Sequence, residues 1–245
     1  MKILVCITHV PDTVSKITFS DNNTRLNPAG IQFIIGPYDD YALARAVEIK
    51  EANGAQVTVL NVGKADTEPT IRKALAIGAD DAVRIDVEPQ DAFQVARLIA
   101  DYVKANPFDL VLMGRESIDY NGGLVHGLVG ELLGWPSVSP VMKLDLNGTT
   151  ATMAKEVEGG KEYVELTLPF VAGCQEPIAE WKIPNMRGIM SARTKPLQVL
   201  ADTGAALSSE VTSFDLPPAK SAVKIIPSDA AEQLINLLHT EAKVI

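Results

Sequence analysis

The glycine pair Gly122-Gly123 stands where a strand would turn into a helix, and this arrangement points most directly to chemistry. The run Asp109–Met113 before it is short and apolar, as in a buried strand, and Leu124–Leu133 after it has the apolar spacing of a helix. The first N–H groups of a helix lack internal partners, and the helix dipole favours negative charge there. Glycine lets the backbone approach an anion without an intervening Cβ. We therefore expect a nucleotide phosphate near Asn121–Leu124.

An ordinary strand-to-helix turn is the alternative, because this segment fits neither G-x-G-x-x-G nor the Walker pattern. Arg115 follows the strand and is expected to pair with a phosphate or a partner carboxylate, or else to be solvated. Asp119 is expected to hold the turn or cap the helix. His126, in the first turns of the helix, is expected at the surface.

Other combinations of reactive side chains do not emerge from the sequence. The two cysteines, Cys6 and Cys174, are far apart and lie among apolar neighbours, so we expect packed, inert thiols. The histidines have no metal-ligand spacing, and no Ser-His-Asp or paired-carboxylate pattern is found. The sequence therefore predicts a binding protein without catalytic or metal-ligating residues.

The elements that must position the glycine pair alternate between strands and helices. Strands are expected at 2–7, 56–62, 81–85 and 109–113, and helices at 38–53, 67–77, 92–105 and 122–133. Strands that are apolar on both faces and separated by helices indicate a parallel sheet covered on both sides. The expected fold is a doubly wound, Rossmann-like α/β domain, in which ligands bind at the carboxyl ends of strands.

The pattern changes after Trp135. Apolar and polar residues alternate over 141–146, 150–157 and 163–168, with Asn147-Gly148 and Gly159-Gly160 between these runs. Such dipeptides favour hairpin turns, so an antiparallel extension is expected at the sheet edge. Residues 176–196 are rich in proline and expected to be irregular.

The C-terminal part is expected to form an arm. Residues 201–227 carry no periodic run, and Ser228 or Asp229 is expected to cap a short helix over 230–239. A helix on such a long connection favours docking on a partner subunit, with wrapping round its own domain as the alternative. The expected division is 1–196 for the α/β domain and 197–245 for the arm.

Composition narrows the class of protein. The chain has 245 residues, a net charge of −9 and a pI near 4.9, which argues against a nucleic-acid binder. Neither a signal peptide nor a membrane span is expected, since the apolar run after Lys2 is short. Two isolated cysteines suit a reducing compartment, so a cytoplasmic location is expected.

Several stretches together resemble the electron transfer flavoprotein beta subunit family. They follow one another in the family's order over most of residues 1–200. They are Lys2-Ile-Leu-Val-Cys-Ile-Thr-His-Val-Pro-Asp12, Gly36-Pro-Tyr-Asp-Asp-Tyr-Ala-Leu43, Ile71-Arg-Lys-Ala-Leu-Ala-Ile-Gly-Ala-Asp-Asp-Ala82, Leu110-Val-Leu-Met-Gly-Arg-Glu-Ser-Ile-Asp119, Glu165-Leu-Thr-Leu-Pro169 and Ile183-Pro-Asn185.

The resemblance implies a heterodimer with an alpha subunit that holds a redox-active FAD. It also implies an adenine-nucleotide site on this chain, filled by AMP or, in electron-bifurcating members, by a second FAD. The base would lie against residues 6–8 and 62–63, and the phosphate against 119–125. The full set of implied cofactor-binding residues is Cys6, Ile7, Thr8, Tyr38, Asp39, Val62, Gly63, Gly114, Arg115, Asp119, Asn121, Gly122, Gly123, Leu124 and Val125.

This chain departs from the family pattern at the phosphate turn. Leu124-Val125 stand where the family usually has Gln followed by Thr or Val, so the phosphate must rely on backbone N–H groups. Gly36 replaces a usual Asn, and Thr8 replaces a common Lys. Tyr38-Asp39 and Arg187-Gly188 look more like the bifurcating group.

A second candidate site lies within residues 180–195, where apolar side chains stand among lysines and arginines. An apolar anchor ringed by charge is typical of a docking loop. The stretch resembles the family's recognition loop for an acyl-CoA dehydrogenase, with Ile183 at the anchor position; packing on its own domain is the alternative. The implied partner-binding residues are Trp181, Ile183, Pro184, Met186, Arg187, Ile189 and Met190.

The resulting hypothesis is a non-enzymatic subunit of a flavin-based electron carrier, served by acyl-CoA or other flavin dehydrogenases. One alternative is a bifurcating flavoprotein whose second FAD is reduced by NADH. Another is an ATP-binding or ATP-hydrolysing protein of the same fold, although the Ser-Gly-Gly-x-Asp-Ser signature of ATP pyrophosphatases is missing.

Overall fold

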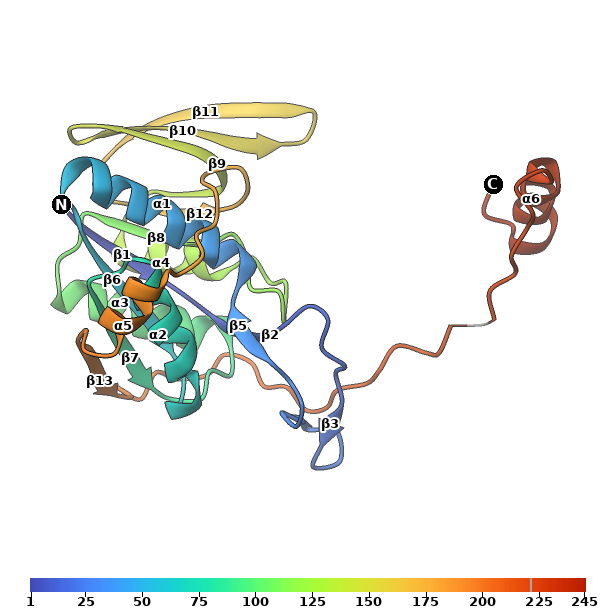
Figure 1. Cartoon of the computed structure of the whole chain (residues 1–245), viewed down its shortest axis with the longest axis horizontal. Helices are drawn as coiled ribbons and strands as arrows, with labels where there is room; N and C mark the ends of the chain where they lie inside the picture. The colour runs from blue at the N-terminus through green and yellow to red at the C-terminus, as the bar shows by residue number, and fades with distance from the viewer. Residues whose placement is uncertain (221) are drawn as a thin grey trace.

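Parallel strands form the middle of a nine-stranded sheet, whose order is β11-β10-β9-β12-β8-β1-β6-β7-β13 (Figure 1). The structure is a computed structural model that describes every residue of the chain except 221. The expected strands are found as β1 (Lys2–Cys6), β6 (Gln56–Val62), β7 (Asp81–Asp86) and β8 (Leu110–Gly114), and neighbouring pairs among them are parallel. The doubly wound α/β fold is therefore confirmed.

Helices between these strands begin and end close to the expected residues. They are α1 (Pro37–Asn53), α2 (Glu68–Ile77) with a 3-10 turn before it (Ala65–Thr67), α3 (Ala92–Ala105) and α4 (Val125–Leu133). Gly54 ends α1 in the left-handed conformation, with φ 68°. The Asp91 side chain caps α3 by accepting a hydrogen bond of 2.6 Å from the Gln94 N–H. The helix expected over 122–133 begins later, at Val125, which leaves both glycines of the pair in the turn before it.

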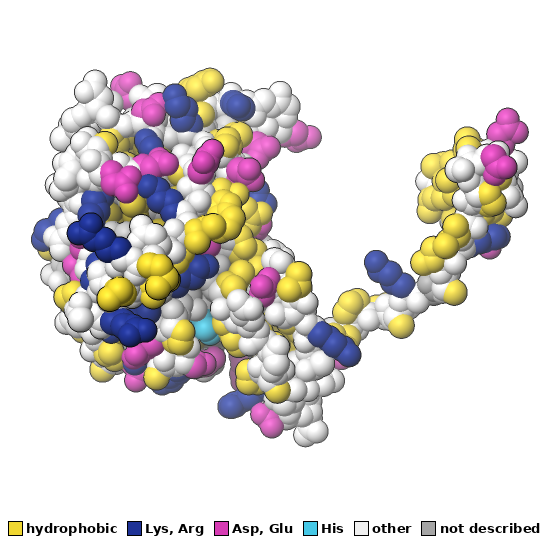
Figure 2. All heavy atoms as spheres, in the orientation of Figure 1, with side chains coloured by type: hydrophobic (Ala, Val, Ile, Leu, Met, Phe, Trp, Pro, Cys, Tyr) yellow, Lys and Arg dark blue, Asp and Glu magenta, His cyan; other side chains and the backbone are white. Residues whose placement is uncertain are grey.

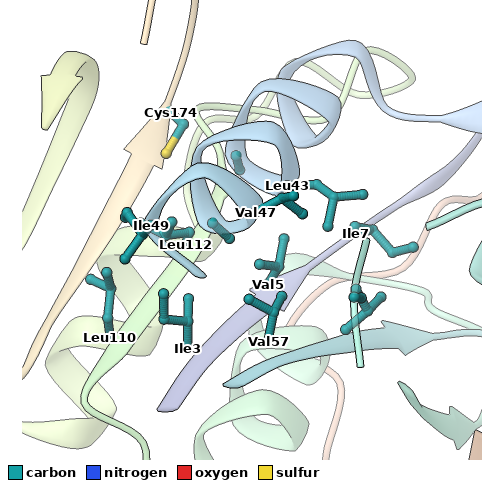
Figure 3. Close-up of a cluster of buried hydrophobic side chains, with 14 of the residues drawn as sticks. Ile3, Val5, Ile7, Leu43, Val47, Ile49, Val57, Leu110, Leu112 and Cys174 are labelled. Carbon is teal, nitrogen blue, oxygen red and sulfur yellow. The ribbon is translucent and has the colours of Figure 1, made fainter. Parts of the chain in front are cut away.

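Apolar side chains cover both faces of the sheet. On one face, α1 and α2 pack over β1, β8 and β6; Figure 3 shows Leu43, Val47 and Ile49 of α1 above Ile3 and Leu110. On the other face, Ile99 and Val103 of α3 and Val129 of α4 join a second buried cluster. Burial on both faces explains why the strand sequences are continuously apolar rather than alternating.

The antiparallel extension is also found at one end of the sheet. It consists of β9 (Ser137–Asn147), β10 (Thr150–Val157) and β11 (Gly160–Thr167), joined by turns in which Gly148 and Gly159 have positive φ. β12 (Phe170–Cys174) was not expected; it is fully buried and pairs in parallel with both β8 and β9. This strand connects the extension to the parallel sheet.

Two small ladders lie outside the main sheet, and neither was expected. In one, β2 (His9–Pro11) pairs with β5 (Phe33–Ile35), and in the other β3 (Phe19–Ser20) pairs with β4 (Arg25–Leu26). The β3–β4 hairpin projects from the body of the molecule (Figure 1). It lies beside the first part of the C-terminal arm.

The C-terminal region differs from expectation in three places. Residues 176–196, expected to be irregular, contain α5 (Met186–Ala192), and β13 (Leu197–Ala201) adds an edge strand to β7 within the predicted arm. The terminal helix α6 (Ala231–Leu237) is followed by a π-helical turn (Leu238–Ala242). The N-cap position of α6 is Ala230 and no side chain among the described residues caps it, so neither Ser228 nor Asp229 has the expected role. Figure 1 shows the last part of the arm extending away from the body, with α6 at its end.

Candidate functional site

The carboxyl ends of β8, β1 and β6 bring the residues expected around the base and the phosphate to one edge of the sheet. β1 lies between β8 and β6, and its last residue, Cys6, pairs with Leu60, two residues before the end of β6 at Val62. The segments beyond the strands are tied together as well, since the Asn61 side chain donates a 2.9 Å hydrogen bond to the Ile7 carbonyl. The expected base-side residues therefore lie on adjacent segments.

Asp39, at the start of α1, ties the ends of β1 and β8 together. Its carboxylate accepts hydrogen bonds from the Thr8 N–H (2.8 Å), the Thr8 hydroxyl (2.6 Å) and the Gly114 N–H (2.8 Å). Burial raises the pKa of Asp39 to about 6, although these hydrogen bonds act in the opposite direction. Both oxygens of Asp39 face this chain's own donors, so the residue positions Thr8 and Gly114 within the site.

The close approach of α1 to these strand ends requires glycine at two positions. A Cβ on Gly114 would lie 2.5 Å from the Asp39 Oδ1 and 2.8 Å from the Tyr38 Cβ. A Cβ on Gly36 would lie 2.6 Å from the Asp39 Oδ2. The chain's departure from the family pattern at Gly36 therefore fits the tight packing around Asp39.

The turn between β8 and α4 is built by its own polar groups. Asp119 accepts a 2.5 Å hydrogen bond from the Ser117 hydroxyl and a 2.9 Å hydrogen bond from the Tyr120 N–H. Asn121 and Gly123 take left-handed conformations, with φ of 49° and 58°. Asp119 thus holds the turn, as expected.

At the end of this turn the N-terminus of α4 is open. Leu124 occupies the N-cap position, and no side chain caps the helix in the part of the chain that the structure describes. A Cβ on Gly122 would meet nothing within 4 Å, and Asn121 is exposed. The expected phosphate residues Asn121–Val125 therefore lie together at an uncapped helix start. The Asn121 N–H already donates to the Ser117 carbonyl (2.8 Å), so the backbone donors offered to an anion are those from Gly122 onward.

Arg115 and Tyr38 are engaged within the chain. The guanidinium donates to Glu116 (2.9 Å) and to the Gln175 side-chain oxygen (2.8 Å), and it lies 4.9 Å from the centre of the Tyr38 ring. The carboxylate that Arg115 pairs with belongs to this chain, and the pairing raises the pKa of Arg115. The positive charge of Arg115 is thus already paired with the Glu116 carboxylate beside the turn.

His126 was expected at the surface, but the ring is largely buried against β12. Its Nδ1 is buried and lacks a hydrogen-bond partner among the described residues, and a Cβ on Gly173 would lie 2.9 Å from its Cδ2. Burial lowers the pKa of His126, which favours the neutral ring. The spacing along the helix could have predicted this burial, since His126 shares a helix face with buried Val129 and Gly130.

The remaining reactive side chains are packed. Cys6 and Cys174 are buried free thiols, and burial raises the pKa of both, that of Cys174 to about 12. His9 stacks on Phe33 with ring centres 4.4 Å apart, and its Nδ1 lies 2.8 Å from the Thr70 hydroxyl. Both thiols are packed as expected, and His9 is partly buried and engaged by Phe33 and Thr70.

The second candidate site forms an exposed apolar patch on and before α5. We call Trp181, Ile183, Met186, Ile189 and Met190 the docking patch; their exposed fractions are 59, 74, 73, 40 and 69%. Pro184 and Arg187 lie within the same stretch. Figure 2 shows apolar side chains in this region with lysine and arginine side chains around them. The patch does not fold back onto its own domain, although α5 itself is seated there.

The seat of α5 is helix α2. Arg72 of α2 donates to the carbonyls of Ala192 (2.8 Å) and Lys195 (2.7 Å), and the Lys195 ammonium returns a 2.8 Å hydrogen bond to the Leu75 carbonyl. A Cβ on Gly188 would lie 3.3 Å from the Ala76 carbonyl carbon and closer still to its oxygen. Gly188 is thus required by the contact between α5 and α2.

Among the described residues, no group of His, Cys, Asp and Glu is arranged to hold a metal ion. The helices of the described chain are too short or too polar to cross a membrane. The chemistry of the site is therefore that of backbone donors at a strand edge and of an exposed docking patch.

The chain is similar to known proteins over its whole length. A family model described as the electron transfer flavoprotein domain matches residues 25–205. The chain is 35% identical to the electron transfer flavoprotein subunit beta of Bacillus subtilis, with 100% of both chains covered. It is 34% identical to the same subunit of Syntrophomonas wolfei (100% and 98% covered) and 30% identical to that of Homo sapiens (100% and 99% covered). The chain belongs to the electron transfer flavoprotein beta subunit family.

Proposed function

We propose that this chain pairs with an alpha subunit, binds an adenine nucleotide at the carboxyl edge of its sheet, and docks flavin dehydrogenases whose electrons pass to an FAD held with the alpha subunit. The nucleotide is AMP in this proposal. The chain itself contributes binding and positioning, and bound FAD supplies the electron-transfer chemistry.

The open N-terminus of α4 is the observation that carries the nucleotide site. Uncapped N–H groups at a helix start bind phosphate well, because they are oriented donors at the positive end of the helix dipole. Gly122 keeps the approach to these groups clear, since a Cβ there would point into open space. The residues present therefore fit a nucleotide phosphate bound through backbone donors.

The carboxylates near this position are engaged in hydrogen bonds with neutral donors of this chain. Asp39 is buried, with 3% of its surface exposed, and accepts hydrogen bonds from Thr8 and Gly114. One Asp119 oxygen accepts from Ser117 and Tyr120. Hydrogen bonds from neutral donors spread each negative charge, which reduces its repulsion of a phosphate.

The docking patch supports the second half of the proposal. A cluster of exposed apolar side chains on a monomer marks an interaction surface more often than chance exposure does. Lysines and arginines around it attract an acidic partner to a chain whose net charge is −9. Ile183, the most exposed apolar side chain of the patch, is the proposed anchor.

The proposal is tested by the small molecules released from the purified heterodimer. Heat-denatured protein should release about one FAD and one AMP per heterodimer, as expected for one flavin site and one nucleotide site. Release of about two FAD molecules would replace AMP by FAD and support the bifurcating alternative. ATP turnover by the chain without flavin or partner would instead support the ATP-hydrolysing alternative.

Three further expectations remain predictions. They are a cytoplasmic location, the lack of nucleic-acid binding, and docking of acyl-CoA or other flavin dehydrogenases. Fractionation of cells followed by detection of this chain tests the first.

A further inference from the structure

We propose that the C-terminal arm is held on its own domain by a two-point clasp, which directs the last part of the arm towards the partner subunit. The first point is formed by Asp91 and the N–H groups of Ser208 and Ser209. The second is formed by Phe214 and the β3–β4 hairpin. This inference rests on the proposed function in one respect, since the partner that the arm meets is the alpha subunit.

At the first point, the Asp91 carboxylate both caps α3 and binds the arm. One oxygen of Asp91 caps α3, while the other accepts hydrogen bonds from the Ser208 N–H (2.5 Å) and the Ser209 N–H (2.7 Å). These contacts help to lower the pKa of Asp91. The arm is therefore tied to the start of α3 by hydrogen bonds to a charged acceptor, which are stronger than neutral ones.

The second point combines an aromatic stack with a backbone hydrogen bond. The Phe214 ring is stacked on Phe19 with centres 5.0 Å apart and an angle of 12° between the planes. The Phe214 N–H donates to the Asn23 carbonyl over 2.7 Å. Between residues 202 and 220, Ala205 and Phe214 are the half-buried side chains, and the others are exposed. Phe214 is therefore partly buried at the second point, whereas Ser208 and Ser209 are exposed and are held at the first point by their hydrogen bonds to Asp91.

The tip of the β3–β4 hairpin, which contacts Phe214, has a defined backbone conformation. Asp21, Asn22 and Asn23 take consecutive left-handed conformations, with φ of 51°, 58° and 64°. Asp and Asn tolerate this region better than other non-glycine residues. The Thr24 hydroxyl donates to the Asp21 carbonyl over 2.7 Å and helps to close the turn. The tip therefore presents the Asn23 carbonyl in one orientation.

Beyond Phe214 the arm is no longer held by the body. Among the described residues, the hydrogen bonds and ion pairs of residues 215–245 run to other residues of the same stretch, such as that from Lys224 to Glu241. Figure 1 shows this part leaving the body and ending in α6. Phe214 is thus the last fixed position before the free part.

The residues after the clasp favour a stiff backbone, which keeps the arm pointing in the direction that the clasp sets. Pro217-Pro218 follow Phe214 closely, and proline pairs favour an extended, semi-rigid backbone. At the far end, α6 exposes Leu234 (45%) and Ile235 (58%), which are the side chains that a partner would cover. A tethered contact binds more tightly when its tether points towards its site, because the effective concentration at the site is higher.

Two measurements on the full-length chain test the clasp. In the isolated chain, Phe214→Ala should reduce the hydrogen-exchange protection of the Ser208, Ser209 and Phe214 amides by about fivefold. Phe214→Tyr keeps the ring and should retain protection, and Leu216→Ala removes a nearby exposed side chain and should leave protection unchanged. In titrations with the alpha subunit, Phe214→Ala should weaken affinity by about fivefold.

The double variant separates the clasp from a direct partner contact. If the stack is responsible, Phe19→Ala, Phe214→Ala and the double variant should weaken alpha-subunit binding to the same extent. Additive losses, or lost protection with unchanged affinity, would overturn the inference. Failure of the wild-type chain to bind the alpha subunit would refute the proposed heterodimer, whereas the exchange measurement would still decide whether the clasp exists.

Discussion

Gly122 and Gly123 differ in what their backbones require, and this decides how the phosphate site is best tested. Gly123 has φ 58°, where any side chain is strained, whereas Gly122 lies outside the left-handed region and has space for a Cβ. A substitution at Gly122 therefore changes the approach to the α4 N-terminus without forcing the backbone. With valine at position 123, a loss of binding could not be separated from the effect of backbone strain.

We expect Gly122→Val to weaken nucleotide binding by about tenfold or more, because the branched side chain would occupy the space in front of the backbone donors. Equilibrium binding of AMP to the purified protein measures this. Gly127→Ala is the control, since Gly127 lies in α4 and also has open space around its Cβ position. Equal affinity of the wild type, Gly122→Val and Gly127→Ala for AMP would show that the phosphate does not bind at this turn.

Asp39 predicts a specific pH dependence of stability. Its pKa is raised from 3.8 to about 6, so between these values the folded chain binds more protons than the unfolded chain. The contribution of Asp39 to stability is then fully present below this window and is lost as the pH rises through it, by about 3 kcal/mol for a shift of about two units. Asp39→Asn removes the titrating group and should remove this part of the slope.

Denaturant unfolding of both proteins between pH 4 and pH 7 gives the measurement. Taking the difference between wild type and Asp39→Asn cancels the contribution of neighbouring Asp40, whose pKa is also raised to about 6. Parallel stability curves would show that Asp39 is ionised throughout and that its hydrogen bonds outweigh its burial.

At the scale of elements, local signals decided where most helices and strands begin and end. Gly54 ends α1, Asp91 caps α3, and the apolar runs of β6 and β8 are where the residues indicate. α5 was missed because it is short and is held by Arg72, which comes from a distant part of the chain. β12 was missed because its parallel partners β8 and β9 come from elsewhere in the sequence.

The docking patch gives a prediction at this scale. Ile183 is 74% exposed, so Ile183→Ala should change the unfolding free energy by less than about 0.5 kcal/mol. If Ile183 anchors a dehydrogenase, flavin reduction by that partner should slow by about fivefold or more, as for a typical interface hot spot. Stopped-flow reduction of the reconstituted heterodimer measures the rate.

Val14→Ala provides the matched control, because Val14 is 87% exposed in a loop near the N-terminus. Flavin content and melting temperature should be the same for both variants. Reduction of Ile183→Ala at the wild-type rate would show that the exposed patch serves another contact.

At the scale of the whole molecule, the free part of the C-terminal arm begins later in the chain than the sequence indicated. The sequence division placed it after residue 196, but β13 pairs with β7 and Leu200 packs against the second core cluster. The clasp then holds the chain as far as Phe214. Truncation at these two positions should therefore have different consequences.

A chain ending at Phe214 should unfold with nearly the wild-type free energy, within about 1 kcal/mol, because the removed residues form few contacts with the body. A chain ending at residue 196 loses the edge strand and should be less stable by about 3 kcal/mol, the order expected for uncovering leucine side chains. Denaturant titration of both chains measures this. Similar stability for both would mean that β13 contributes little to the fold.

Residue order alone was enough to predict the alternating strands and helices, the antiparallel extension and the glycine turn, because these depend on periodicity, capping and backbone freedom within short windows. It also carried the family resemblance. Which strands become neighbours, that Asp39 joins Thr8 to Gly114, that His126 is buried against Gly173, and that Phe214 meets Phe19 all depend on contacts between residues far apart in the chain. Such contacts exist only in the folded structure, so patterns within a short stretch of sequence do not reveal them.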